Sequence, residues 1–128
     1  MWVVNAFTRL ILRTPWLRRL ADHQVVELRF AGVRTGRAVV LPVMYAQRGD
    51  RLVVLVGGSD EKRWWRNFTR PHPVRVLLRG VARTGIGHVA DGSAARAEAA
   101  GIYAVRFPEL PVEDDPILVI TLDPAPGR

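Results

Sequence analysis

The chain contains no cysteine, only one lysine and no long uninterrupted apolar run. Without cysteine, neither a disulfide framework nor a thiolate zinc site can form, and nothing in the sequence requires an oxidising compartment. The histidines His23, His72 and His88 are too widely spaced for a recognisable metal site, so we interpret them as structural or solvated. These absences favour a cytoplasmic protein without a metal ion.

The charge of the chain is strongly basic, with a formal net charge of +7, and all its basic residues except Lys62 are arginine. The planar arginine fork binds carboxylate and phosphate, so an anionic partner fits this composition. A genomic bias toward arginine codons would produce the same composition. No recognisable nucleic-acid-binding module accompanies the charge, and we do not expect nucleic acid as a partner.

Residues 1–20 are predicted to form an amphipathic helix that is broken or kinked at Pro15. The segment is too short and too charged to span a bilayer, and Arg9 and Arg13 interrupt the apolar run that a signal peptide needs. Two interpretations stay open. The helix packs against its own domain, or it lies on an anionic membrane surface as a peripheral contact.

The rest of the chain alternates apolar runs with turn residues, which is typical of β structure. Six strands are expected. They lie around residues 26–30, at 38–45, at 52–56, on each side of Gly80 within 73–90 (one strand per side), and at 116–122. Turns at residues 32–36 and 48–50 would join the first three strands into a meander. The strands at 38–45 and 52–56 are apolar at nearly every position, so both of their faces are expected to be buried.

Two helices are expected among these strands. A short one carries Trp64 and Trp65, and a second covers residues 91–106, with Asp91 as its N-cap. Gly85 and Gly87 are expected to loosen the strand that precedes the second helix.

The connections between strands are too short for parallel crossovers, so an antiparallel barrel is the natural packing. The predicted fold class is therefore mainly β with peripheral helices (α+β), with six strands, an N-terminal helix and two further helices in a single domain over residues 1–128. Apolar residues on both faces of some strands further predict a homodimer, because a second subunit would cover the face that the core does not use.

Several motifs occur in a characteristic order: "GVRTGRAVVLPVMY", "LVVLVGG", "KRWWRNF", "PVRVLLRG", "IYAVRFPEL" and "PILVITL". Together they resemble the deazaflavin (F420)-dependent nitroreductase family of split β-barrel proteins, over about residues 23–122. Each motif alone is weak, whereas the ordered set is fairly specific. The resemblance implies an antiparallel split β-barrel that binds F420.

The turn at residues 32–37 combines glycines with arginines and a hydroxyl. Glycine lets backbone N–H groups approach an anion closely, and Thr35 and the arginine forks add directed donors. The turn lacks the spacing and the lysine of a P-loop. From the residues alone, an ordinary hairpin turn with exposed arginines is the favoured interpretation. The resemblance implies that this turn binds the phosphate-bearing tail of the cofactor.

A second cluster follows the strand at 52–56, where small residues lead into the tryptophan segment. Free N–H groups at such a junction can support a flat ring or a phosphate, and the junction is also an ordinary strand-to-helix turn. Adjacent side chains on a helix diverge by about 100°, so one tryptophan is expected to anchor the helix while the other borders a cofactor groove. Both tryptophans being core anchors is the alternative. The predicted cofactor-binding residues are Arg34, Thr35, Gly36, Arg37, Val56, Gly57, Gly58, Ser59, Lys62, Trp64, Trp65 and Asn67.

The resemblance implies that reduced deazaflavin delivers a hydride to an electron-poor acceptor such as a quinone, an activated alkene or a nitro compound. Tyr45 and Tyr103 are candidate proton donors or substrate-site walls, and packing is the alternative role for both. Two other functions remain: a non-catalytic split-barrel protein that holds FMN, haem or another tetrapyrrole, and an arginine-driven protein that binds a nucleic acid or a membrane surface.

Overall fold

The computed structural model describes residues 25–56, 63–110, 112 and 114–124. Its elements are β1 (Val25–Ala31), β2 (Ala38–Met44), β3 (Ala46–Arg48), β4 (Arg51–Leu55), η1 (Trp64–Phe68), β5 (His72–Leu78), β6 (Val81–Val89), α3 (Ser93–Arg106) and β7 (Ile117–Leu122). The predicted amphipathic helix at residues 1–20 lies outside the described residues. Within the described ranges, no helix is long and apolar enough to cross a membrane.

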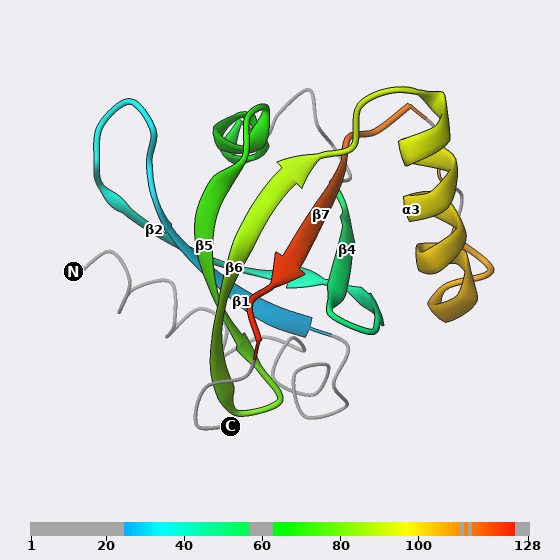
Figure 1. The fold of residues 1–128 in the computed structure, drawn as a ribbon, viewed down its shortest axis with the longest axis horizontal. Coiled ribbons are helices and arrows are strands. Elements are labelled where there is room, and N and C mark those ends of the chain that lie inside the picture. The colour runs from blue at the N-terminus through cyan, green and yellow to red at the C-terminus, as the bar shows by residue number, and fades with distance from the viewer. Residues whose placement is uncertain (1–24, 57–62, 111, 113, 125–128) are drawn as a thin grey trace.

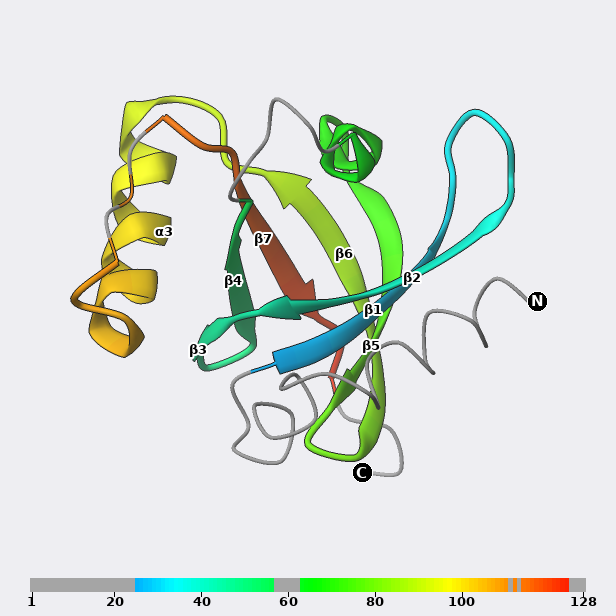
Figure 2. The same ribbon diagram turned by 180° about the vertical axis from the view of Figure 1, so that it is seen from behind.

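The strands form one curled sheet in the order β2-β1-β5-β6-β7-β4-β3, and every neighbouring pair is antiparallel (Figures 1 and 2). The strands β2 and β3 stand at opposite ends of this order, although only Tyr45 separates them in the chain. The curled sheet is consistent with the predicted split barrel, and its antiparallel pairing is confirmed.

The predicted strand count of six is wrong because the second strand of the meander is divided. Residues 38–44 pair with β1, whereas residues 46–48 pair with β4. One continuous segment therefore bends at Tyr45 and changes partner there. The predicted turns on either side of it are confirmed, since β1 and β2 flank residues 32–37 and β3 and β4 flank Gly49 and Asp50.

Burial along the meander follows the predicted pattern only in part. In β1, Val26, Leu28 and Phe30 are buried in alternation with the outward Glu27 and Arg29, as expected. Three consecutive residues of β4, 52–54, are buried, so burial of both faces is confirmed there. The same expectation is wrong for β2, where only Val40 is buried and its neighbours are half-buried or exposed. The strand β2 lies at an end of the sheet order, with β1 as its one ladder partner.

The two helices differ from the prediction in kind and in boundaries. The tryptophan segment forms a five-residue 3₁₀-helix, η1, rather than an α-helix. The second helix, α3, begins at Ser93, and Asp91 is not its N-cap. Gly92 occupies the cap position with a φ of 87°, in the region that favours glycine, and no side chain caps the helix.

The apolar side chains form two clusters on opposite sides of the sheet. The larger lies inside the curl, where β1, β4, β5 and β7 contribute residues such as Leu28, Leu52, Val76 and Ile120. The smaller lies between α3 and the outer side of β3, β4 and β7, and it contains Ile102, Tyr103 and Phe107. Figure 1 shows α3 beside β4 and β7, while η1 lies near the start of β5.

The glycines of β6 do not loosen this strand, which is regular from Val81 to Val89 and pairs with β5 and β7. They provide space for close neighbours instead. A Cβ on Gly85 would lie 2.6 Å from the carbonyl oxygen of Thr121, and a Cβ on Gly87 would lie 2.7 Å from the ring of Phe68. The predicted loosening is therefore wrong, because glycine is needed here for close packing.

Candidate functional site

The turn at residues 32–37 is closed by its own backbone. The Gly32 N–H donates to the Arg37 carbonyl and the Gly36 N–H donates to the Gly32 carbonyl, both at 2.8 Å. The Arg37 N–H donates to Thr35 Oγ1 at 3.2 Å, and Gly36 has a φ of 71°. The side chains of Arg34 and Arg37 are exposed. The turn is thus a compact loop that presents guanidinium groups to solvent.

Asn67 connects this turn to η1, 34 residues further along the chain. Its Oδ1 accepts a hydrogen bond from the Val33 N–H at 2.8 Å, and its Nδ2 donates to the Trp64 carbonyl at 2.8 Å. The predicted cofactor-binding residues fall in three segments, 34–37, 56–62 and 64–67, and Asn67 holds the first and the third of these against each other. Both lie at the same end of the sheet in Figure 1.

The first tryptophan of the pair is an anchor. Trp64 packs against the inner core cluster, with its ring centroid 6.5 Å from that of Phe30 and 6.4 Å from that of Phe68. Trp65 is half-buried, belongs to neither core cluster among the described residues, and has the guanidinium of Arg66 5.7 Å from its ring centroid. The adjacent side chains thus have different surroundings, as the prediction required.

Phe68 is the deepest anchor of η1, and the sequence reasoning missed it. Its side chain is fully buried, and its ring lies edge-on to Phe30 at 4.8 Å and to His72 at 5.7 Å between centroids. His72 Nε2 in turn donates to the Ala31 carbonyl at 2.6 Å, at the end of β1. The signal for Phe68 in the sequence was its position, four residues after Trp64.

The third predicted segment is described only at its beginning. Val56 is buried, and its N–H donates to the Pro116 carbonyl at 3.0 Å, which fixes the end of β4 to the start of β7. The predicted residues Gly57, Gly58, Ser59 and Lys62 lie outside the described residues.

The two tyrosines lie in different core clusters, and among the described residues no hydrogen bond or ring contact joins either of them to η1 or to the turn at residues 32–37. Tyr45 is buried in the inner cluster, and its hydroxyl accepts a hydrogen bond from Arg79 Nη1 at 3.2 Å. Tyr103 is buried under α3 against Phe107, and this burial raises the pKa of its hydroxyl.

A groove of about 510 Å³ runs along the outer side of β2, β1, β5 and β6, and Gly36 lies at its margin. Arg29 and Arg75 line it together with apolar residues such as Val40, Pro73 and Ile86. On its far side, the Thr84 hydroxyl donates to Asp123 Oδ2 at 2.8 Å. The groove thus extends from the arginine-bearing turn over an apolar floor. The sequence did not predict this groove.

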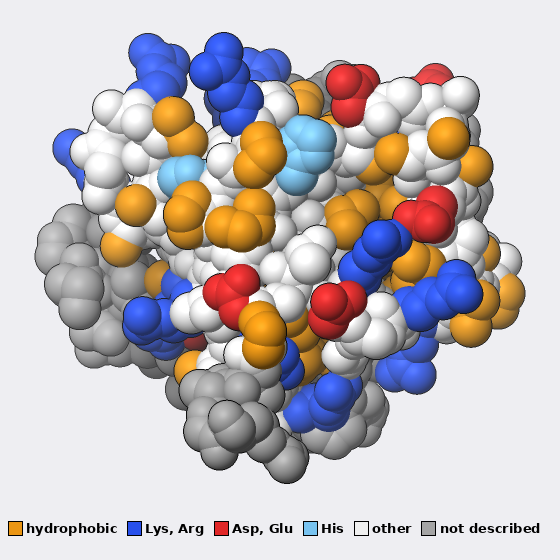
Figure 3. Space-filling view, in the orientation of Figure 1, with side chains coloured by type: hydrophobic (Ala, Val, Ile, Leu, Met, Phe, Trp, Pro, Cys, Tyr) orange, Lys and Arg blue, Asp and Glu red, His pale blue; other side chains and the backbone are white. Residues whose placement is uncertain are grey.

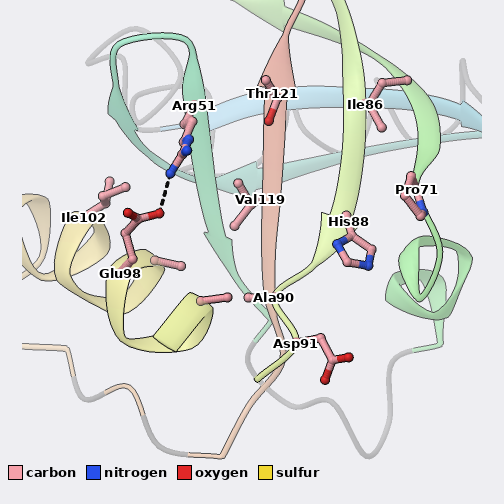
Figure 4. Close-up of a pocket in the computed structure, with 12 residues that line it drawn as sticks. Arg51, Pro71, Ile86, His88, Ala90, Asp91, Glu98, Ile102, Val119 and Thr121 are labelled. Atoms are coloured by element: carbon pink, nitrogen blue, oxygen red, sulfur yellow. Dashed lines mark hydrogen bonds and ion pairs between the residues drawn. The ribbon is translucent and has the colours of Figure 1, made fainter. Parts of the chain in front are cut away.

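A smaller groove of about 310 Å³ lies between α3 and the outer side of β6 and β7 (Figure 4). An ion pair between Arg51 and Glu98 forms one wall, and His88 lies on the opposite wall. Ile86 lines both grooves, so the two adjoin on one face of the molecule. Figure 3 shows this face, with hydrophobic and histidine side chains gathered over its upper part and acidic and basic side chains below and around them.

The chain matches no protein-family model and no curated protein. Solved structures resemble its fold. A structure described as a domain-swapped dimer aligns with 93% of this chain and 96% of its own, at 12% identity and a TM-score of 0.59. The haem storage protein HutZ from Vibrio cholerae aligns with 88% of this chain and 91% of its own, at 14% identity and a TM-score of 0.62.

An FAD-binding protein from Mycobacterium smegmatis aligns with 84% of this chain and 87% of its own, at 8% identity and a TM-score of 0.54. An F420-H2-dependent reductase aligns with 76% of this chain and 93% of its own at 14% identity, but its TM-score of 0.48 is too low to carry weight. Likeness at such identities shows the fold and no activity. The fold fits the split β-barrel family that the sequence resembles.

Proposed function

We propose that this chain is a deazaflavin-dependent oxidoreductase that binds F420 where the turn at residues 32–37 meets η1. The single observation that carries the proposal is the double hydrogen bond of Asn67. It joins the arginine-bearing turn to the tryptophan segment, and the sequence resemblance assigned both to one cofactor site. An anionic tail would then find Arg34 and Arg37 on one side, and the planar part would lie toward Trp65.

The residues present fit an anionic cofactor. Arg34 and Arg37 are exposed, no ion pair engages either guanidinium among the described residues, and the turn itself contains no carboxylate. Arginine binds phosphate through paired N–H groups, so these side chains would position the tail. Trp64 and Phe68 hold η1 rigidly on the core, which fixes the orientation of its neighbours. Bound reduced deazaflavin would supply the hydride, while the protein orients the cofactor and limits the access of water.

A non-catalytic carrier of FMN, haem or another tetrapyrrole is the second candidate. The chain has only two tyrosines: Tyr103 is buried under α3, and the hydroxyl of the buried Tyr45 is bound by Arg79 at the β5–β6 turn. A tyrosine proton donor beside the cofactor is therefore missing, and a carrier needs none. The solved structures of similar fold include a haem storage protein and an FAD-binding protein, which supports this alternative.

The test is a titration of the protein with oxidised F420, with FMN and with haemin, followed by tryptophan fluorescence. We expect quenching by F420 at micromolar concentration and at least about tenfold weaker binding for the double variant R34Q/R37Q, because two charge-assisted contacts are lost. R48Q removes an exposed arginine from β3 and is the matched control. Binding of FMN or haemin without binding of F420 would contradict the proposal.

Activity separates the enzyme from the carrier. Reduced F420 mixed with the protein and a quinone or enone acceptor should return to its oxidised absorbance spectrum. A spectrum that stays unchanged while the cofactor is bound would favour the carrier.

We also propose that the chain forms a homodimer through the outer side of β1, β5 and β6. This face exposes Ile86 to 42%, and its apolar groove is flanked by charges of both signs, Arg75 and Asp123. A surface that carries both signs around an apolar centre can be complementary to a second copy of itself.

A further inference from the structure

A hollow of about 570 Å³ lies between the bend of the β2–β3 segment, the β5–β6 turn and the C-terminal end of α3. Its described lining residues are Tyr45, Ala46, Gln47, Gly49, Arg79 and Arg106. The lining thus includes two guanidinium groups, a hydroxyl and a side-chain amide, and no carboxylate among the described residues. No residue of the proposed cofactor site contributes to it.

Arg79 occupies a backbone position that does not suit it. With Gly80 it forms the two-residue turn between β5 and β6, and both residues have positive φ, 48° for Arg79 and 81° for Gly80. Such turns favour asparagine or glycine at the first position, because a larger side chain is strained there. Arg79 is the only non-glycine residue with positive φ in the described part of the chain. A strained residue of this kind points to a role for its side chain.

That side chain reaches into the hollow. Arg79 Nη1 donates to the hydroxyl of the buried Tyr45 at 3.2 Å, which orients the guanidinium. Arg106 lines the hollow from the last turn of α3, with its guanidinium 5.9 Å from the ring centroid of Phe107. No ion pair engages Arg79 or Arg106 among the described residues.

A cation in the last turn of a helix stabilises that helix, so the position of Arg106 alone has a structural explanation. Arg79 has a structural contact too, the hydrogen bond to Tyr45, but this bond uses only one of the five N–H groups of its guanidinium, and the rest of the group lines the same hollow as Arg106. Two like charges near one cavity repel each other, and an anion placed between them would remove the repulsion.

We infer that this hollow is a second ligand site, which binds the phosphate or carboxylate group of a small organic anion. The anionic group lies between Arg79 and Arg106 and accepts hydrogen bonds from both. The Tyr45 hydroxyl and the Gln47 amide provide further polar contacts. The hollow is larger than a bare phosphate ion and falls in the range of small-molecule pockets, so the rest of the ligand also has room.

The test is an NMR titration with pyrophosphate and, separately, with citrate in a buffer of low ionic strength, with sodium chloride at equal ionic strength as the salt control. We expect saturable shifts of the backbone amide signals of Ala46, Gly49 and Gly80. A response to pyrophosphate alone identifies a phosphate site and a response to citrate alone identifies a carboxylate site. No saturable shift at these amides with either probe would overturn the inference.

The variant R79N separates ligand binding from folding. Asparagine suits the strained turn position, and this gain offsets the lost hydrogen bond to Tyr45, so the Tm should change little, while anion binding weakens by about tenfold or more. R106Q should weaken binding similarly, and R70Q, an exposed arginine just after η1, is the matched control. Unchanged affinity in both R79N and R106Q would overturn the inference. F420 binding by R79N should match that of the unaltered protein, which distinguishes this site from the proposed cofactor site.

Discussion

Asn67 connects two parts of the chain through one short side chain. An amide group both accepts and donates, so it can bind the Val33 N–H and the Trp64 carbonyl at the same time. The sequence resemblance assigned Asn67 to cofactor binding. The structure adds a positioning role, since without this amide the turn at residues 32–37 would lose the hydrogen bond from the Val33 N–H that joins it to η1.

We predict that N67A lowers the free energy of unfolding by about 1–2 kcal/mol, because two hydrogen bonds are lost at a partly exposed position. It should also increase the hydrogen-exchange rate of the Val33 amide, which NMR measures directly.

The variant N67D is the matched control, because it keeps an acceptor for Val33 and replaces the donor to Trp64 with a carboxylate oxygen that cannot donate. Its Val33 amide should stay protected. Equal protection of that amide in N67A and in the unaltered protein would show that Asn67 does not hold the turn.

At the scale of single residues, the sequence predicted what local geometry decides and missed what depends on distant partners. The divergence of adjacent side chains correctly separated the surroundings of Trp64 and Trp65. The burial of Tyr45 and its contact with Arg79 were not predictable, because the bend that places Tyr45 there depends on a ladder to β4. Local patterns carry no information about such distant partners.

Among the elements, β6 and η1 depend on each other. Phe68 lies directly over Gly87, and its ring would collide with any larger residue there. Phe68 is fully buried and also contacts Phe30 and His72, so it has little freedom to move away. The glycine in β6 is therefore what allows η1 to sit on the core.

We predict that G87A lowers the free energy of unfolding by about 1–3 kcal/mol through overpacking. G101A is the same substitution inside α3, where an added Cβ meets nothing within 4 Å. It should raise the stability by about 0.5–1 kcal/mol, because alanine favours a helix more than glycine does. Chemical denaturation of both variants checks the opposite signs, and a neutral or stabilising G87A would contradict this account of the β6–η1 contact.

The positions of the strands were more predictable than their number. Alternation located β1 and the apolar runs located β4 and β7, because burial imposes these patterns directly on the residues. The division of one apolar run into β2 and β3 could not be predicted from the sequence, since both parts remain β-strand and only the pairing partner changes. The tryptophan segment was predicted as a helix, but its 3₁₀ geometry depends on tertiary packing of Trp64 and Phe68.

For the whole molecule, the outer face of β1, β5 and β6 is a surface on which no described helix packs. The helix α3 covers β3, β4 and β7, while η1 lies at an end of the sheet (Figure 1). Ile86 lies between the two grooves on this outer face. A second subunit is the proposed cover.

We predict that sedimentation velocity finds a dimer, and that I86E shifts it to monomer because a buried carboxylate without a partner is costly. V105E places the same charge on α3, at a side chain that is 85% exposed, and should remain dimeric. A monomer at all concentrations, or an I86E protein that dimerises normally, would contradict the proposed interface.

The position of β7 has a consequence for the order of assembly. It is the last of the described strands in sequence, yet it pairs with both β6 and β4 inside the sheet order. Before residues 117–122 are available, the described strands can form only two separate ladders, β2-β1-β5-β6 and β4-β3. A chain emerging from the ribosome would therefore expose the unpaired edges of β6 and β4 until residues 117–122 have been made, and chaperones that bind exposed strands would have access to these two edges for that time.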